Sequence, residues 1–203
     1  PKTADVVIIG GGVVGTATAY YLAKSGRKNV VLLEKNTVCS GSTGRCGAGI
    51  RAQWGLELNC RMALACLDTF EQLDEELGLP TGLNQGGYLL VAYKEKEWEQ
   101  FKKNVELQHS LGICPGVAVD DALGFTYYSR DGHADPFLTT FAFQEAAKRH
   151  GAKFYKFTEV TGLKTEGGNI KAVETNHGTI ECGSVINCAG AWAQDIAAMA
   201  GIK

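Results

Sequence analysis

Three glycines near the N-terminus have the spacing of a phosphate-binding turn. Gly10, Gly12 and Gly15 follow the apolar run of residues 6–9 and precede a run of small residues with helical character. Between a strand and a helix, the first glycine permits a tight turn, the second lets the backbone approach a pyrophosphate, and the third lets the helix lie close to the strand. The helix N-terminus adds free N–H groups and the positive end of a dipole. This spacing predicts a dinucleotide site.

One acidic residue extends this prediction to the sugar. A second apolar run, at residues 30–33, ends in Glu34. Its carboxylate can accept hydrogen bonds from a ribose diol and disfavours a 2′-phosphate, so we expect NAD or FAD and not NADP. A glycine-rich turn in an ordinary βαβ unit would explain the glycines, but it would leave this acid unexplained.

A polar loop follows, with candidate chemistry of its own. Residues 39–51 read CSGSTGRCGAGIR, so the hydroxyls of Ser42 and Thr43 and the guanidinium of Arg45 lie close together in the chain. These groups can surround an anion or the polar edge of a ring, and the glycines among them let a flat ring lie against the backbone. Arg51 is a candidate for holding a substrate carboxylate through paired hydrogen bonds. The alternatives are a solvated loop and a surface arginine.

The chain around these residues predicts an α/β fold. We expect a βαβ unit, an α+β insertion, and a return to a strand that ends in small residues. An antiparallel meander over residues 153–182 is typical of flavoproteins and favours FAD over NAD. The expected helices are 16–25, 56–77, 94–111 and 136–150, and the expected strands are 6–9, 30–33, 87–92, 125–128, 153–157, 159–165, 170–175, 179–181 and 184–188.

Composition argues against several classes of protein. The chain has 203 residues, of which 45% are hydrophobic and 21% charged, and its formal net charge of −2 argues against a nucleic-acid partner. Its apolar runs are shorter than the roughly 20 residues of a membrane span, and we see no signal peptide. The 7 cysteines lack CxxC spacing, which argues against disulfides and metal centres. We therefore expect a cytoplasmic protein with reduced cysteines and no metal.

Five motifs together resemble those of a known family. The motifs are IIGGGVVG at 8–15, LEK at 33–35, GSTGRCGAGIR at 41–51, DGHADPF at 131–137 and VINCAGAW at 185–192. They are similar to those of the D-amino-acid-oxidase-type FAD-dependent oxidoreductases, above all the branch of sarcosine oxidase β subunits and dye-linked L-proline dehydrogenase β subunits. The resemblance implies a Rossmann-like FAD/NAD(P)-binding domain with a three-stranded antiparallel meander, plus part of an inserted α+β substrate domain.

The resemblance also implies an activity and a site. It implies FAD-dependent oxidation of the C–N bond of a small secondary or N-methyl amino acid, of the sarcosine or L-proline type. Arg51 matches the position that holds the substrate carboxylate, and partner subunits of a hetero-oligomeric dehydrogenase are expected. The cofactor is assigned to Gly10, Gly12, Val13, Val14, Gly15, Glu34, Lys35, Ser42, Thr43, Arg45, Cys46, Gly47, Gly49, Ile50, Val160, Ala189, Gly190 and Trp192.

The resemblance further divides the chain into parts. Residues 1–83 and 135–203 are assigned to the FAD-binding domain, and residues 84–134 to part of the substrate domain. Members of the family are longer, so we expect an N-terminal fragment that has little turnover alone. Three alternatives stay open on the sequence: a glycine, D-amino-acid or 2-hydroxy-acid oxidase, a non-catalytic FAD-binding subunit of a larger complex, and an NAD-dependent dehydrogenase.

Overall fold

The computed structural model describes residues 1–118 and 123–202, which divide into two compact units. Unit 1 comprises Pro1–Cys46 and Pro136–Lys203, and unit 2 comprises Gly47–Asp135. By compactness, residues 47–83 therefore group with unit 2, whereas we expected them in the FAD-binding domain. The assignment of the units to cofactor and to substrate stays a prediction.

Unit 1 is built on one six-stranded sheet, and the expected α/β fold is confirmed. The strand order is β8-β2-β1-β11-β10-β9. The strands are β1 (Thr3–Ile9), β2 (Val30–Leu33), β8 (Lys153–Tyr155), β9 (Val160–Glu166), β10 (Asn169–Thr175) and β11 (Gly178–Asn187). The helices are α1 (Val13–Lys24), α4 (Pro136–Arg149) and α5 (Ala193–Met199), with short 3₁₀ turns η1 (Thr43–Arg45) and η2 (Gly190–Trp192).

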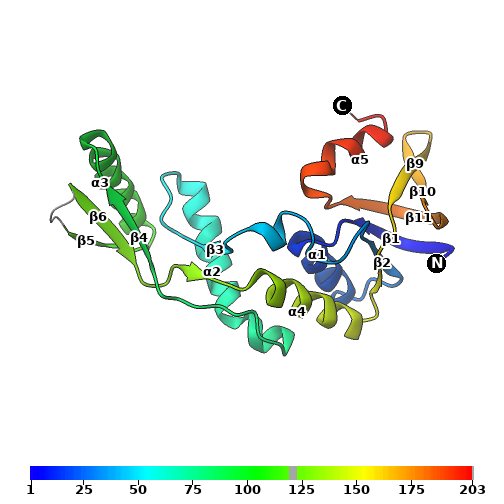
Figure 1. Ribbon diagram of the computed structural model, residues 1–203, viewed down its shortest axis with the longest axis horizontal. Helices are drawn as coiled ribbons and strands as arrows, with labels where there is room; N and C mark the ends of the chain where they lie inside the picture. Colours follow the sequence, from blue (N-terminus) through cyan, green and yellow to red (C-terminus); the bar gives the residue numbers. More distant parts are fainter. Residues whose placement is uncertain (119–122, 203) are drawn as a thin grey trace. The chain divides into compact units, whose positions relative to one another are not determined.

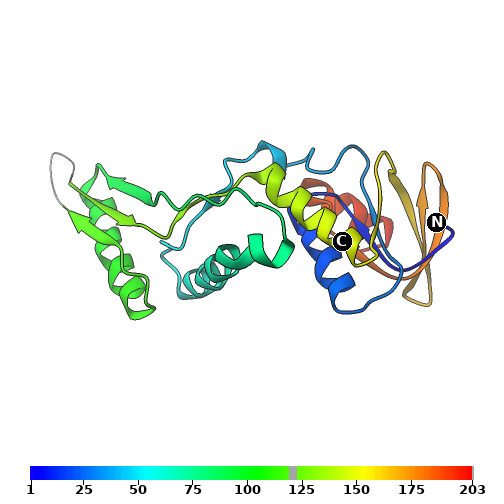
Figure 2. The same ribbon diagram turned by 90° about the horizontal axis from the view of Figure 1, so that it is seen from below.

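The two faces of this sheet carry different helices. Alternate residues of a strand point to opposite faces, and in β1 Val7 and Ile9 join the core cluster that includes Ile196 of α5. On the other face α1 and α4 lie side by side, with the rings of Tyr20 and Phe143 5.8 Å apart (Figures 1 and 2). Helices thus cover both faces of the parallel part of this sheet, as expected of parallel strands with near-continuous apolar sequences.

One long strand replaces two that we predicted. The expected strands 179–181 and 184–188 are a single strand, β11, whose first half pairs antiparallel with β10 and whose second half pairs parallel with β1. Gly183 lies at the changeover, where an added Cβ would lie 3.2 Å from the carbonyl oxygen of Asp5. The three-stranded meander therefore consists of β9, β10 and β11 and extends the parallel sheet, while β8 lies parallel to β2.

Unit 2 combines two helices with a small antiparallel sheet. Helix α3 (Glu95–Ser110) lies against the strands β4 (Tyr88–Ala92) and β6 (Gly124–Tyr128), and β5 (Gly116–Ala118) completes the sheet in the order β4-β6-β5 (Figure 1). Helix α2 (Glu57–Leu77) ends at Gly78, whose φ of 62° is the left-handed conformation that glycine favours at this position. The two-residue strands β3 (Gly49–Ile50) and β7 (Gly132–His133), which we did not predict, pair with each other.

The described residues contain neither a helix that could cross a membrane nor a cluster of metal ligands. Within residues 1–118 and 123–202, no helix has both the length and the apolar character that a membrane crossing requires. In the same ranges, no cluster of three or more His, Cys, Asp or Glu side chains has the geometry to hold a metal ion.

Candidate functional site

Unit 1 contains a crevice at the carboxyl ends of its parallel strands. Its volume is about 570 Å³, within the range of small-molecule sites. Ile9 and Leu33, the last residues of β1 and β2, line it together with Cys188, which follows β11. In open α/β sheets, ligands bind outside the carboxyl ends of the strands. The crevice therefore lies where the glycine motif predicts a dinucleotide.

The glycine motif forms the floor of the crevice, and two of its glycines are required by close packing. Gly10 has a φ of 111°, and an added Cβ would lie 2.3 Å from the carbonyl oxygen of Cys188. At Gly15 an added Cβ would lie 1.9 Å from the carbonyl oxygen of Gly10. These distances leave no room for a side chain. They match the predicted roles of a tight turn and of close packing between helix and strand.

The N-terminus of α1 opens on the crevice with amides that lack an acceptor. The amide of Val13 donates to the hydroxyl of Thr43 at 3.2 Å. No acceptor among the described residues faces the amides of Gly12 and Val14, and both residues line the crevice. A Cβ added to Gly12 would meet only Thr43 within 4 Å. An anion bound here would satisfy the amides and interact favourably with the helix dipole.

Glu34 stabilises the glycine turn through its own carboxylate. Its Oε2 accepts a hydrogen bond from the amide of Gly11 at 2.7 Å, and its Oε1 accepts one from the amide of Asn36 at 2.8 Å. Each carboxylate oxygen has a second lone pair, so the side chain can still accept from a ribose diol. The expected sugar ligand is thus also a structural part of the turn, a role that the sequence did not suggest.

The rim of the crevice carries charges of both signs. Lys35 places its ammonium 3.9 Å from the ring centroid of Trp192, within the range of a cation–π interaction. Arg45 adds a second cation, and Glu159 and Asp195 add carboxylates to the lining. A site that holds both a diphosphate and sugar hydroxyls needs donors and acceptors of this kind. The donor set therefore fits a dinucleotide.

The small residues after β11 form a turn that a side chain holds in place. Asn187 donates from Nδ2 to the carbonyl oxygen of Ala193 at 2.7 Å and accepts from the amide of Ala189 at 3.2 Å. Burial raises the pKa of the Cys188 thiol in this turn, despite a hydrogen bond with Thr18 that lowers it. A scarce thiolate is a poor nucleophile, so Cys188 is a lining residue of the crevice.

Most of the predicted cofactor residues come together in this crevice, although contact with a cofactor stays a prediction. Those that line it are Gly10, Gly12, Val14, Glu34, Lys35, Ser42, Thr43, Arg45, Val160, Ala189, Gly190 and Trp192. Val13, Gly15 and Cys46 belong to unit 1 but do not line it. Gly47, Gly49, Ile50 and Arg51 belong to unit 2. The crevice is also lined by residues that we did not predict from the sequence, namely Ile9, Gly11, Leu33, Asn36, Ser40, Gly41, Thr158, Glu159, Cys188, Ala191, Asp195, Ile196 and Met199.

Some of the missed residues had a sequence signal and others had none. Gly11 lies inside the glycine motif, and Cys188 lies inside the run VINCAGAW, so both could have been included. Asp195 and Met199 lie on α5, a short helix that follows the last expected strand. Thr158 and Glu159 had no local signal, because they lie next to Glu34 only in the folded chain, where the amide of Thr158 donates to the carbonyl oxygen of Glu34 at 2.9 Å.

Two glycines of the polar loop have a packing role that we did not anticipate. A Cβ added to Gly44 would lie 2.1 Å from the carbonyl oxygen of Cys39, and one added to Gly49 would lie 2.2 Å from the hydroxyl of Tyr88. We had attributed these glycines to the approach of a flat ring. The protein's own backbone and a tyrosine occupy the space that their missing side chains leave.

In unit 2, Arg51 has an unusual environment. Its guanidinium carbon lies 4.0 Å from the ring centroid of Trp54, whose indole N–H donates to the carbonyl oxygen of Arg51 at 2.7 Å. The Nε of Arg51 is buried without a hydrogen-bond partner. Buried donors normally have an acceptor, so this N–H is consistent with a bound anion or an ordered water. A surface arginine would not be held in this way.

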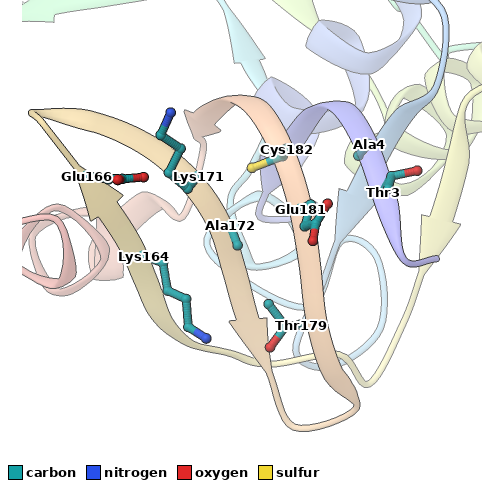
Figure 3. Close-up of a pocket in the computed structure, with 9 residues that line it drawn as sticks. All are labelled: Thr3, Ala4, Lys164, Glu166, Lys171, Ala172, Thr179, Glu181 and Cys182. Carbon is teal, nitrogen blue, oxygen red and sulfur yellow. The ribbon is translucent and has the colours of Figure 1, made fainter.

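A second hollow, of about 610 Å³, lies on the open face of β1, β9, β10 and β11 (Figure 3). Its volume is close to that of the crevice, so volume does not distinguish them. Lys164, Glu166, Lys171 and Glu181 alternate in charge along the strands and are exposed. Lys164 is paired with a carboxylate outside the hollow at 3.2 Å. A solvated sheet face explains this hollow, whereas the crevice has converging backbone donors.

Comparison with known proteins agrees with this geometry. The sequence model of the family described as FAD dependent oxidoreductase matches residues 5–203. Sarcosine dehydrogenase of Homo sapiens, described as mitochondrial, is 35% identical over 224 residues, which cover 100% of the chain and 24% of that protein. Sarcosine oxidase subunit beta of Arthrobacter sp is 31% identical over 221 residues, which cover 100% of the chain and 55% of that protein.

A solved structure is also similar over the whole chain. The crystal structure of L-proline dehydrogenase from P. horikoshii matches with a TM-score of 0.93 and 39% sequence identity, and the match covers 100% of the chain and 57% of that protein. The chain thus spans about a quarter of the length of the mitochondrial relative and little more than half of the other two.

Proposed function

Because this chain belongs to the family of FAD dependent oxidoreductases, we propose that it contributes to the oxidation of the C–N bond of a small secondary or N-methyl amino acid. The names of its relatives, which refer to sarcosine and L-proline, support this substrate class. Glycine, D-amino acids and 2-hydroxy acids are the competing substrates on the same fold, because a fold does not select its substrate.

We assign the FAD to the crevice of unit 1. The diphosphate is proposed to accept hydrogen bonds from the amides of Gly12 and Val14, and the ribose diol to donate to Glu34. Thr43 and Arg45 complete the set of phosphate donors. The unpaired amides at the helix N-terminus and the free lone pairs of the Glu34 carboxylate support this assignment.

We assign the substrate carboxylate to Arg51. When bound, FAD would supply the oxidising power for the C–N bond, and the chain supplies the position of the substrate. The single observation that carries this part is the Nε of Arg51, which is buried without an acceptor while the guanidinium stacks on Trp54. A carboxylate that accepts from the guanidinium would satisfy that donor.

Substrate oxidation by the full-length protein tests the function. The purified protein is mixed without oxygen with sarcosine, L-proline, glycine, D-alanine or lactate, and loss of the flavin absorbance is followed. We expect sarcosine or L-proline to bleach the flavin fastest. Fastest bleaching by D-alanine or lactate would replace the proposed substrate class. Bound flavin that none of the five compounds reduces would favour the alternative of a non-catalytic FAD-binding subunit. A colourless protein that binds NADH would favour the alternative of an NAD-dependent dehydrogenase.

Substitution of Arg51 tests the carboxylate site. In the full-length protein, Arg51→Ala is expected to raise KM for the amino acid by about 10- to 100-fold, the scale of one lost charge-assisted hydrogen bond. Arg61→Ala is the matched control, because Arg61 is an exposed arginine of the same unit, paired with Glu57 at 2.7 Å. An unchanged KM in Arg51→Ala would remove this residue from the substrate site.

We also propose that the chain works with partner subunits and without a metal, in the cytoplasm. The similarity to a protein called subunit beta supports the first part, and the lack of metal-ligand clusters in the described residues is compatible with the second. Size-exclusion chromatography with light scattering on the native protein tests the assembly. A single species with the mass of one chain would contradict it.

A further inference from the structure

A buried carboxylate holds the segment that carries Arg51. Asp131 is 0% exposed, and its Oδ1 accepts a hydrogen bond from the amide of Ala52 at 2.7 Å. Its Oδ2 accepts one from Nε2 of Gln53 at 2.9 Å. The carboxylate thus contacts the two residues that follow Arg51, although it lies about eighty positions away in the sequence.

Gln53 connects this carboxylate to the sheet of unit 2. Its Nε2 also donates to the carbonyl oxygen of Tyr88 at 3.0 Å, and its Oε1 accepts from the hydroxyl of Thr126 at 2.8 Å. All polar atoms of the Gln53 side chain are therefore bonded inside the protein, where Gln53 is only 4% exposed. A fully satisfied buried network of this kind specifies one conformation of the segments that it joins.

The backbone of Asp131 is fixed as well. Its amide donates to the carbonyl oxygen of Tyr128 at 3.1 Å, and its carbonyl oxygen accepts from the amide of Gly87 at 2.8 Å. Strands β4 and β6 therefore determine where the carboxylate lies, and the carboxylate determines where residues 52 and 53 lie. The chain of contacts runs from a rigid sheet to the residue next to Arg51.

Burial raises the pKa of this carboxylate and the positive charge of Arg51 lowers it, but the two side chains form no hydrogen-bonded pair. In the ranges 1–118 and 123–202, Arg51 forms no ion pair, and the oxygens of Asp131 are occupied by Ala52 and Gln53. The guanidinium stacks on Trp54, which is bonded to the carbonyl oxygen of Arg51 on the same short loop. The segment is thus held firmly while its cation keeps its capacity to bind an external anion.

We propose that Asp131, acting through Ala52 and Gln53, is a positioning residue that sets the direction of the Arg51 guanidinium for a substrate carboxylate. The inference rests on the proposed function, because it assumes that Arg51 binds that carboxylate. Asp131 itself does not contact the substrate. Its effect is on binding geometry, and a misplaced cation weakens a directional, charge-assisted hydrogen bond.

The test is Asp131→Asn in the full-length protein. The introduced amide keeps the acceptor for Ala52 but turns a donor toward the Nε2 donor of Gln53. We expect KM for sarcosine or L-proline to rise by about 10-fold, the scale of one weakened charge-assisted bond, with kcat within about threefold of wild type and unchanged flavin content. Inhibition by acetate should weaken in parallel, whereas inhibition by dimethylamine, which lacks a carboxylate, should not.

Two further variants separate positioning from general stability. Asp74→Asn is the matched control, since Asp74 accepts from the amide and hydroxyl of Thr81 at 2.8 and 2.6 Å in the same unit but does not contact the Arg51 segment. It should leave KM unchanged. The double variant Q53E/D131N reverses donor and acceptor between the two positions, and we expect it to recover part of the lost affinity.

The outcomes distinguish the inference from its premise. An unchanged KM in Arg51→Ala would overturn the proposed role of Arg51. A raised KM in Arg51→Ala together with an unchanged KM in Asp131→Asn would overturn only the positioning role. If Asp131→Asn does not fold, Thr126→Val tests the positioning role in its place. It removes the hydroxyl that donates to Gln53 and nearly conserves the side-chain volume. It should raise KM by about threefold, and wild-type KM there would contradict the proposal.

Discussion

The two units build their candidate sites from different parts of the polypeptide. In unit 1 the crevice is built around the glycine turn, the ends of three strands, and the unpaired amides of Gly12 and Val14. In unit 2 the candidate site is made of side chains, with Arg51 stacked on Trp54 and the segment held by the buried Asp131. The first site depends on a local turn that glycines permit and on the ends of three neighbouring strands, and the second on side-chain contacts between distant segments.

This difference shows where a sequence is informative. A backbone site needs residue types that permit a conformation, and glycines at fixed spacing signal it directly. A side-chain site needs partners that meet only after the strands have paired. Glu34 is one exception in unit 1, because its side chain bonds both the amide of Gly11 and the amide of Asn36.

The largest expected effect tests the backbone site. Gly12→Val places a branched side chain where the diphosphate is proposed to lie, while the φ of −78° at Gly12 is ordinary for any residue. We expect FAD binding to weaken by at least about 100-fold, the cost of two lost charge-assisted hydrogen bonds, with an intact fold. Flavin content and circular dichroism of the purified variant measure this.

A matched control exists for that variant. Gly86→Ala adds a Cβ whose nearest neighbour would be 3.8 Å away, in unit 2, and should retain its flavin. Wild-type flavin content in Gly12→Val would show that the crevice is not the cofactor site. The comparison between a cofactor site in unit 1 and a substrate site in unit 2 would then be wrong.

The next effect tests the side chain of Glu34, which holds the glycine turn of the crevice. Glu34→Ala leaves the amides of Gly11 and Asn36 without their acceptor, so we expect the FAD-free protein to lose about 1–3 kcal/mol of unfolding free energy. Urea unfolding of the FAD-free protein measures it. The control is Glu159→Ala, a crevice carboxylate that accepts no hydrogen bond from any described residue. Equal stability of the two variants would contradict the structural role of Glu34.

The smallest expected effect is the pH dependence of the unfolding free energy that Asp131 contributes in unit 2. Burial raises the pKa of Asp131 above the unfolded value of about 3.9, although hydrogen bonds with Ala52 and Gln53 and the charge of Arg51 lower it. The folded protein therefore binds this proton more tightly than the unfolded chain. That contribution to stability is present at low pH and is lost as the pH rises from about 3.9 through the raised pKa.

The unfolding free energies of wild type and Asp131→Asn measure this effect between pH 4 and 7. The advantage of wild type over the variant should shrink as the pH rises, by about 1.4 kcal/mol for each pKa unit of the shift. An advantage that grows over this range would mean that the native environment favours the ionised carboxylate more strongly than water does.

Much of the fold follows from local patterns in the sequence. The βαβ unit, helix α2 with its end at Gly78, and the start of α4 at Pro136 were predicted from periodicity and from residues that begin or end helices. The continuous strand β11 was not, because polar residues near Gly183 resemble a turn until β1 and β10 pair with the strand on either side. The two-residue strands β3 and β7 carry too short a pattern to detect.

The candidate site was predictable to a similar extent. The glycine motif, Glu34 and the hydroxyls of the polar loop identified the location of the crevice, because each has a local reason for its residue type, but about half of the lining residues were missed. Gly49 was assigned to a flat ring, yet the hydroxyl of Tyr88 fills its space. Asp131 begins the motif DGHADPF, but nothing in that motif indicated a contact with residues 52 and 53, since an aspartate before a glycine usually indicates a turn.

The sequence by itself determined the turn, the acid that follows the second strand and the cation at position 51, because these depend on which backbone conformations and charges each residue type allows. Only the tertiary structure decided that Glu34 accepts a hydrogen bond from the glycine turn and that the buried N–H of Arg51 has no partner. It also decided that Asp131 accepts hydrogen bonds from residues 52 and 53. These features depend on distances between segments far apart in the chain, and folding alone establishes such distances.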